Sequence, residues 1–144
     1  MNTRKNWILA LVVIGLTAIA AQAQADPSVQ MISAEELKTK VTANQPITLI
    51  DVRSSQGYAN SSNTMKGAIH FKLRKLKSRL AFPPLKDIPK DREIVTYCAC
   101  PNDESSIAAA QILQASGFKR VSVLKGGWQG WLKANGPVEP RTKT

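Results

Sequence analysis

The sequence is poor in the side chains that many enzymes use for catalysis. It contains one histidine, His70, and two cysteines, Cys98 and Cys100. These three residues cannot readily complete the closed ligand shell of a structural zinc site, so we expect neither a metal nor another cofactor. A single histidine at the end of an apolar run is expected to pack or to form a hydrogen bond, and His70 is interpreted in this way.

The two cysteines are also badly placed to stabilise a fold. Only Ala99 separates Cys98 from Cys100. A disulfide between them would close a very small ring and would restrict the unfolded chain hardly at all. The spacing therefore indicates that the cysteines serve chemistry, although it leaves open whether they form a disulfide.

Acidic residues are scarce. Ten Asp and Glu stand against twenty Lys and Arg, which gives a net charge of +10. This excess suits anionic substrates, acidic proteins or an anionic surface. Nucleic acid is not expected as a partner, because no finger spacing or aromatic-interleaved basic motif occurs. The basic stretch Lys72 to Arg79 is interpreted as a solvated helix face or as a rim for peripheral contact with anionic surfaces.

The first 25 residues are interpreted as a signal peptide. Arg4 and Lys5 precede an apolar run from Trp7 to Ala20, which is too short for a comfortable membrane span. Small residues then precede a cleavage position near Ala25. Cleavage there would leave residues 26–144 as a single domain with its core at about 30–135, a net charge of +8, and a periplasmic or secreted location. An uncleaved N-terminal anchor is the alternative.

Strand-like and helix-like segments alternate through the remaining chain. Short apolar runs predict strands, helical spacing with start and stop signals predicts helices, and polar segments predict irregular structure. The expected strands are 47–50, 67–71, 94–97 and 121–124; the expected helices are 34–43, 73–80, 105–116 and 128–134; a loop is expected at 54–63, a charged connector at 86–92 and a frayed tail after 137. Alternation of this kind predicts an α/β fold with a parallel sheet covered on both faces.

The segment after strand 94–97 is the candidate active site. Ligands of parallel sheets bind beyond the carboxyl ends of the strands, and the cysteines stand there. A loop that curls around a sulfur, followed by a helix N-terminus, can stabilise a thiolate without a histidine. The candidate substrate-binding loop comprises Ala99, Cys100, Pro101, Asn102, Asp103, Glu104 and Ser105, with Cys98 as the nucleophile.

Four motifs resemble those of the rhodanese-like family and occur in the family's order. They are Leu49-Ile50-Asp51-Val52-Arg53, Lys66-Gly67-Ala68-Ile69, Val95-Thr96-Tyr97-Cys98 and Leu124-Lys125-Gly126-Gly127-Trp128-Gln129-Gly130-Trp131. The resemblance implies a three-layer fold with a central parallel sheet of about five strands flanked by helices. It also implies a sulfurtransferase that moves sulfane sulfur through a cysteine persulfide, from a small donor or protein persulfide to a thiophilic acceptor such as cyanide or a thiol. Asp51 and Arg53 are interpreted as a structural ion pair.

The loop departs from the family pattern, which commonly carries Cys-Arg-x-Gly-x-Arg-Ser. No basic residue lies between Cys98 and Ser105, and Asp103 and Glu104 would repel an anion if they pointed inward. Thiosulfate is therefore an uncertain donor. Counting from the strand makes Cys98 the nucleophile, whereas counting back from the helix makes it Cys100. One cysteine could also resolve the other through a transient disulfide.

Two other functions remain open. The fold could serve as a catalytically weak sulfur carrier or interaction module, in which case the protein would bind a partner without turnover. A cysteine phosphatase or arsenate reductase is a weaker alternative, because that chemistry needs an arginine to hold the oxyanion. Glu104 or Ser105 occupies the position that would close such a loop.

Overall fold

The computed structural model describes residues 28–142. The predicted signal peptide lies outside this range. In the described part, five parallel strands form one sheet in the order β1-β6-β5-β2-β4. Their bounds are β1 Gln30–Ile32, β2 Ile47–Asp51, β4 Ile69–His70, β5 Glu93–Tyr97 and β6 Arg120–Leu124. The predicted α/β class and parallel sheet are confirmed, and β5, the strand that directly precedes the cysteines, lies at the centre.

Side chains of the central strand alternate between two hydrophobic layers. Ile94 and Cys98 belong to one cluster, whereas Val95 and Tyr97 belong to the other. This alternation follows from the two-residue period of an extended chain. Since both faces of β5 are covered, its apolar residues Ile94, Val95 and Tyr97 are all buried.

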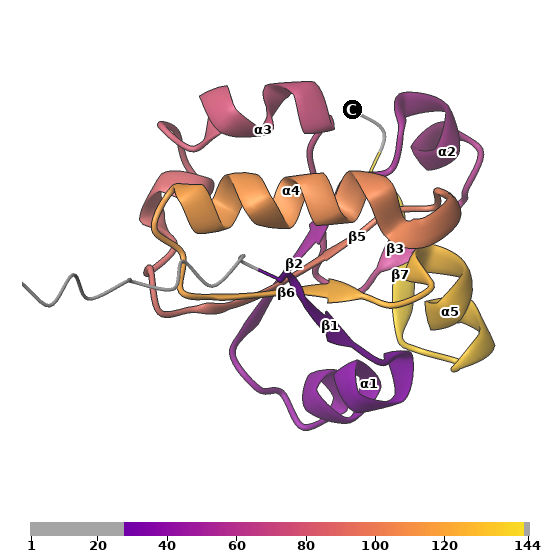
Figure 1. Cartoon of the computed structure of the whole chain (residues 1–144). Helices are drawn as coiled ribbons and strands as arrows, with labels where there is room; N and C mark the ends of the chain where they lie inside the picture. The colour runs from indigo at the N-terminus through magenta and orange to yellow at the C-terminus, as the bar shows by residue number, and fades with distance from the viewer. Residues whose placement is uncertain (1–27, 143–144) are drawn as a thin grey trace, which may run out of the picture.

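Helices cover both faces of the sheet. In Figure 1, α3 and α4 lie on one side, and α1 and α5 lie on the other. The helices are α1 Ala34–Thr42, α2 Ser55–Ala59, α3 Leu73–Arg79, α4 Glu104–Ala115 and α5 Gly127–Lys133, with short 3-10 turns at Leu85–Asp87 and Pro101–Asp103. Helix α1 is capped at its start, because Ser33 Oγ accepts a hydrogen bond from the Glu36 N–H at 3.1 Å.

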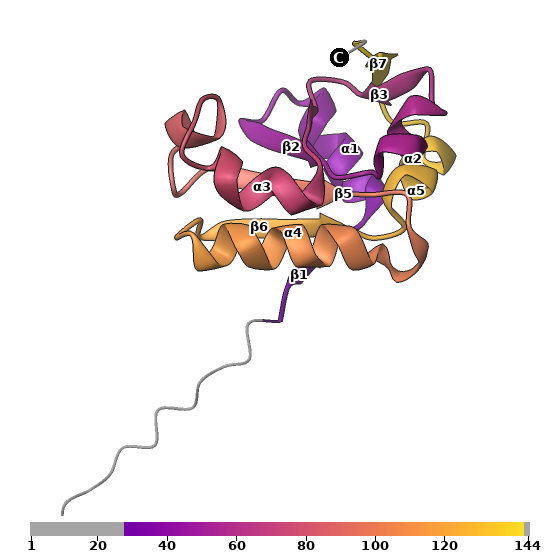
Figure 2. The same ribbon diagram turned by 90° about the horizontal axis from the view of Figure 1, so that it is seen from above.

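Two expectations about secondary structure were wrong. Residues 54–63 are not all loop: Ser54 caps α2 by accepting from the Gly57 N–H at 3.0 Å. The tail after residue 137 is not simply frayed. Its segment β7 Val138–Pro140 pairs antiparallel with β3 Asn63–Met65, and the two strands form a small second sheet (Figure 2). Such pairing between distant segments leaves little trace in either sequence alone.

Strand β1 was also missed. Only Ile32 of its three residues is buried, so the segment has no apolar pattern of its own. It becomes a strand because it pairs with β6 in parallel register, from Gln30 opposite Ser122 to Ile32 opposite Leu124. Within residues 28–142, no helix combines the length and apolar character needed to cross a bilayer.

Candidate active site

Cys98 lies directly beyond the carboxyl end of β5. Its side chain is buried in the cluster beneath α4, and only 1% of the residue is exposed. Its carbonyl oxygen accepts a hydrogen bond from the Trp128 N–H at 2.8 Å. A strand on one side and the start of α5 on the other therefore hold this cysteine in place.

Cys98 and Cys100 are joined by a disulfide, with their Cα atoms 5.6 Å apart. The sequence left open whether the two cysteines form a disulfide, and in this structure they do. Cys100 is partly exposed, in contrast to Cys98. Its Sγ accepts a hydrogen bond from the Ser105 N–H at 3.4 Å. The two residues therefore differ in their access to solvent, although their sulfurs are bonded to each other.

The loop beyond Cys100 makes a sharp turn. Asn102 and Asp103 both adopt left-handed backbone conformations, with φ of 54° and 56°. Asn and Asp tolerate this region better than most residues, because their short polar side chains form local hydrogen bonds. The turn brings the chain back so that α4 begins at Glu104, with the Ser105 N–H directed at the Cys100 sulfur.

Asp103 connects the cysteine loop to the turn between β6 and α5. The residue is buried, and its Oδ2 accepts a hydrogen bond from the Gly126 N–H at 2.9 Å. A Cβ on Gly127 would collide with the carbonyl oxygen of Cys98, so the close approach of these segments requires glycine there. Glu104 is exposed. Of the two acids in the loop, one thus binds a backbone N–H and the other faces solvent.

Ser106 was not singled out from the sequence, yet it touches the buried sulfur. Its Oγ lies 3.5 Å from Cys98 Sγ and donates to the Asp103 carbonyl oxygen at 2.8 Å. The hydroxyl of Thr96 in turn donates to the Ser106 carbonyl oxygen at 2.8 Å. Sequence reasoning could not separate Ser106 from Ser105, because the contact depends on how α4 is rotated against β5.

Asp51 and Arg53 form a buried ion pair on the α5 side of the sheet. The Arg53 Nη2 lies 2.7 Å from Asp51 Oδ2. The guanidinium also stands over the Trp128 ring, 4.4 Å from its centroid. Burial, and secondly the Asp51 charge, raise the pKa of the Tyr97 hydroxyl well above its ordinary value. The hydroxyl therefore stays protonated, donates to Asp51 Oδ2 at 2.9 Å, and fixes the residue before Cys98.

A cavity of about 320 Å³ lies beside the loop. It is bordered by Val52, Arg53, Ser54, Ser55, Lys72, Leu73, Arg74 and Ser105. The exposed residues Lys72 and Arg74 thus reach the same cavity as the first turn of α4. The basic stretch at 72–79 was expected as a helix face, and the structure places these two members of it next to the loop. The serines at 54 and 55 were missed, because the sequence shows only a polar segment there.

His70 has partners of its own. Its ring stacks on Tyr58 with centroids 3.8 Å apart, and its Nε2 lies 3.1 Å from the carbonyl oxygen of Arg53. Within residues 28–142, no group of three or more His, Cys, Asp and Glu side chains is arranged to hold a metal ion. The site contains the two sulfurs, the Ser106 hydroxyl, the Ser105 N–H and the Asp103 carboxylate, with Lys72 and Arg74 nearby.

Comparison with known proteins agrees with this architecture. The model of the Rhodanese-like domain family matches residues 33–134. A sulfurtransferase from Allochromatium vinosum is 26% identical over 110 residues, which cover 76% of this chain and 94% of that protein. The thiosulfate sulfurtransferase GlpE of Glaesserella parasuis is 29% identical over 96 residues, or 67% of this chain and 81% of that protein.

One solved structure is similar to this chain in both fold and sequence. The crystal structure of the Alr3790 protein from Anabaena sp. has a TM-score of 0.64 and 31% identity, and the match covers 76% of this chain and 82% of that chain. With the family match across the folded region, and with the motifs at the carboxyl edge of the sheet, the chain belongs to the rhodanese-like domain family.

Proposed function

We propose that this protein is a sulfurtransferase that carries sulfane sulfur as a persulfide on Cys98. Its similarity to proteins named sulfurtransferases supports sulfur transfer in general. The observation that carries the finer proposal is the position of Cys98, which is anchored beyond the central strand and contacts the first turn of α4. A nucleophile held on a rigid element keeps its geometry while its loop binds substrate.

The chemistry begins from the reduced protein. The Cys98 thiolate attacks the sulfane sulfur of the donor, and a new S–S bond forms. The bond between that sulfur and the rest of the donor breaks, and the leaving group departs with the electron pair. A nucleophilic acceptor then attacks the outer sulfur of the persulfide and releases the Cys98 thiolate.

Polar groups near the sulfurs favour the thiolate form. The Ser105 N–H lies in the first turn of α4, a helix of twelve residues, where the helix dipole favours negative charge. Asp103 opposes this effect less than its charge suggests, because its Oδ2 binds the Gly126 N–H. Ser106 Oγ contacts Cys98 Sγ but gives its hydrogen to the Asp103 carbonyl oxygen, so it positions the sulfur and does not stabilise the thiolate. No histidine base is needed in this arrangement.

An anionic donor fits the neighbouring cavity. Lys72 and Arg74 border it together with Ser54, Ser55 and Ser105, so cations and hydroxyl donors share one space. These cations offer the positive charge that the loop itself lacks. The cavity favours small donors that carry negative charge beside the sulfane sulfur, such as thiosulfonates. Export through cleavage near Ala25, with action in the periplasm or outside the cell, is part of the same proposal.

Intact-mass analysis of the reduced protein tests the proposal. The Cys100→Ser variant should gain one sulfur atom on Cys98 after exposure to a thiosulfonate, whereas Cys98→Ser should gain none. We expect sulfur transfer to cyanide by Cys98→Ser to fall by about a thousandfold or more. Sulfur uptake without transfer to any acceptor would instead favour the carrier alternative. Sulfur uptake on Cys100 in Cys98→Ser, at the rate seen on Cys98, would contradict the assignment.

A further inference from the structure

The disulfide between Cys98 and Cys100 has little to do with stabilising the fold. The two residues are separated by one position in the chain. In the chain-entropy description, a disulfide stabilises by closing a loop in the unfolded state, and the effect shrinks with loop length. The second cysteine therefore calls for a chemical explanation, and its bond to the proposed nucleophile supplies one.

We propose that Cys100 resolves the Cys98 persulfide and releases its outer sulfur as sulfide. This inference rests on the proposed function, since it begins from a persulfide on Cys98. It adds a second activity, in which sulfane sulfur is reduced within the chain and needs no external acceptor. The disulfide in the structure is the product of that step.

The step balances in atoms and electrons. The Cys100 thiolate attacks Sγ of Cys98, the inner sulfur of the persulfide. A bond forms between the two cysteine sulfurs, and the bond between Cys98 Sγ and the outer sulfur breaks. The outer sulfur leaves with the electron pair and with the proton from the Cys100 thiol, as hydrosulfide. Two cysteine thiols are thus oxidised to a disulfide, and one sulfane sulfur is reduced to sulfide.

The geometry of the loop favours Cys100 as the attacking thiol. The Cα atoms of the two cysteines are already at a separation that a disulfide allows, 5.6 Å. The Ser105 N–H lies 3.4 Å from Cys100 Sγ and would stabilise its thiolate. The left-handed residues Asn102 and Asp103 turn the chain between these groups. The same loop therefore brings the second sulfur to the first and activates it.

A dithiol reductant returns the protein to its starting state. Cys100 is partly exposed, whereas Cys98 is buried, so an incoming thiolate meets Cys100 first. Attack on Cys100 Sγ makes Cys98 the leaving thiolate, and the second thiol of the reductant then frees Cys100. A complete cycle converts one sulfane sulfur and one dithiol into one sulfide and one disulfide. The partner is accordingly a small or protein-bound dithiol.

Single-turnover sulfide release tests this inference. Protein is reduced with a phosphine, freed of reductant without air, and mixed with one equivalent of toluenethiosulfonate. Wild type should release about one sulfide per chain and end as the Cys98–Cys100 disulfide. Cys100→Ser should hold a long-lived persulfide on Cys98, with sulfide release at least about tenfold lower. Cys100→Ala should behave in the same way, which shows that the serine hydroxyl is not the cause.

The outcomes separate this inference from the proposed function. If wild type and Cys100→Ser hold persulfide equally long and release equal sulfide, resolution by Cys100 is wrong, while the persulfide on Cys98 stands. If Cys100→Ser takes up no sulfur on Cys98, the proposed function itself fails. Because dithiothreitol can itself take the outer sulfur from Cys98, wild type and Cys100→Ser are compared before any thiol is added.

Discussion

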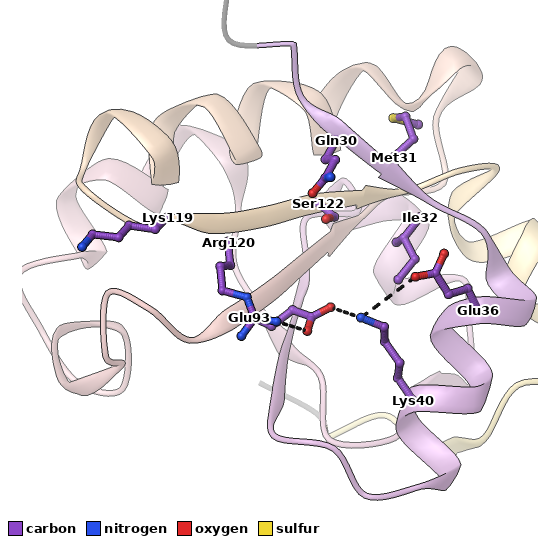
Figure 3. A pocket seen from close by; sticks show the side chains of 9 residues that line it. All are labelled: Gln30, Met31, Ile32, Glu36, Lys40, Glu93, Lys119, Arg120 and Ser122. Carbon is purple, nitrogen blue, oxygen red and sulfur yellow. Dashed lines mark hydrogen bonds and ion pairs between the residues drawn. The ribbon is translucent and has the colours of Figure 1, made fainter.

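The two ends of the parallel sheet use charge in different ways. At the amino end, a cavity of about 330 Å³ is bordered by four charged side chains that pair with one another, Glu36, Lys40, Glu93 and Arg120, and by Lys119, which lies outside these pairs. Glu93 lies 2.7 Å from the Lys40 Nζ and 2.9 Å from the Arg120 guanidinium, and Figure 3 shows this chain of contacts. At the carboxyl end, Lys72 and Arg74 border the cavity beside the cysteine loop.

Neither of these two cations forms an ion pair with another of the residues 28–142. A cation that is already neutralised by a carboxylate offers little to an incoming anion, whereas a free one retains its attraction. The volume of a cavity therefore does not identify the candidate active site. Both cavities are of similar volume, and the one at the carboxyl end is bordered by Ser105, whose N–H contacts the Cys100 sulfur.

Among the substitutions that test this comparison, Gly127→Ala should have the largest effect. The new methyl group would overlap the Cys98 carbonyl oxygen, and the residue would have to keep a φ of +48°. We expect the free energy of unfolding, measured with urea, to fall by about 3 kcal/mol. Persulfide formation should also become slower.

The matched control is Gly67→Ala. Gly67 also has a positive φ, of +77°, but a Cβ there meets nothing within 4 Å. Gly67→Ala should therefore lower the free energy of unfolding by only about 1 kcal/mol, the cost of placing alanine at a positive φ. If the two variants lost equal stability, the close approach of Gly127 to Cys98 would not be a constraint on the fold.

The next largest effect is expected from neutralising the free cations. Lys72→Ala with Arg74→Ala should raise KM for a thiosulfonate by about tenfold and leave stability unchanged, because both side chains are exposed. Steady-state kinetics at low and high salt would measure this, and the difference should shrink as ionic strength rises.

Lys75→Ala with Lys77→Ala is the control for charge. It removes the same charge from the same helix at positions that do not border the cavity. Its KM should stay close to that of wild type. Equal effects of the two double variants would mean that net charge, and not the cavity, attracts the donor.

The smallest effect is expected from a substitution at the amino end of the sheet. Glu93→Gln removes the carboxylate that joins Lys40 to Arg120, and we expect a loss of about 1 kcal/mol or less, because Arg120 is 61% exposed. Sulfur transfer should not change. Glu36→Gln, at the 4.0 Å contact with Lys40, is the control and should have no measurable effect on thermal unfolding. A fall in activity with Glu93→Gln would break the distinction between the two ends.

Sequence patterns predicted the elements whose signal is local. The apolar runs at 47–50, 94–97 and 121–124 became β2, β5 and β6, because a strand buried on both faces must be apolar at successive positions. The segments β1 and β7 escaped prediction, since each is short and largely exposed. Their conformations depend on hydrogen bonds to strands far away in the chain.

For the candidate site, the sequence by itself determined the order strand, cysteine, loop and helix, which places Cys98 at the carboxyl edge of a parallel sheet. It also determined the membership of the family through motifs in order. Only the tertiary structure decided that Asp103 binds Gly126, that Ser106 touches the buried sulfur, and that Lys72 and Arg74 border the cavity of Ser105. These contacts join segments whose distance depends on strand register and helix packing, and no local pattern encodes those quantities.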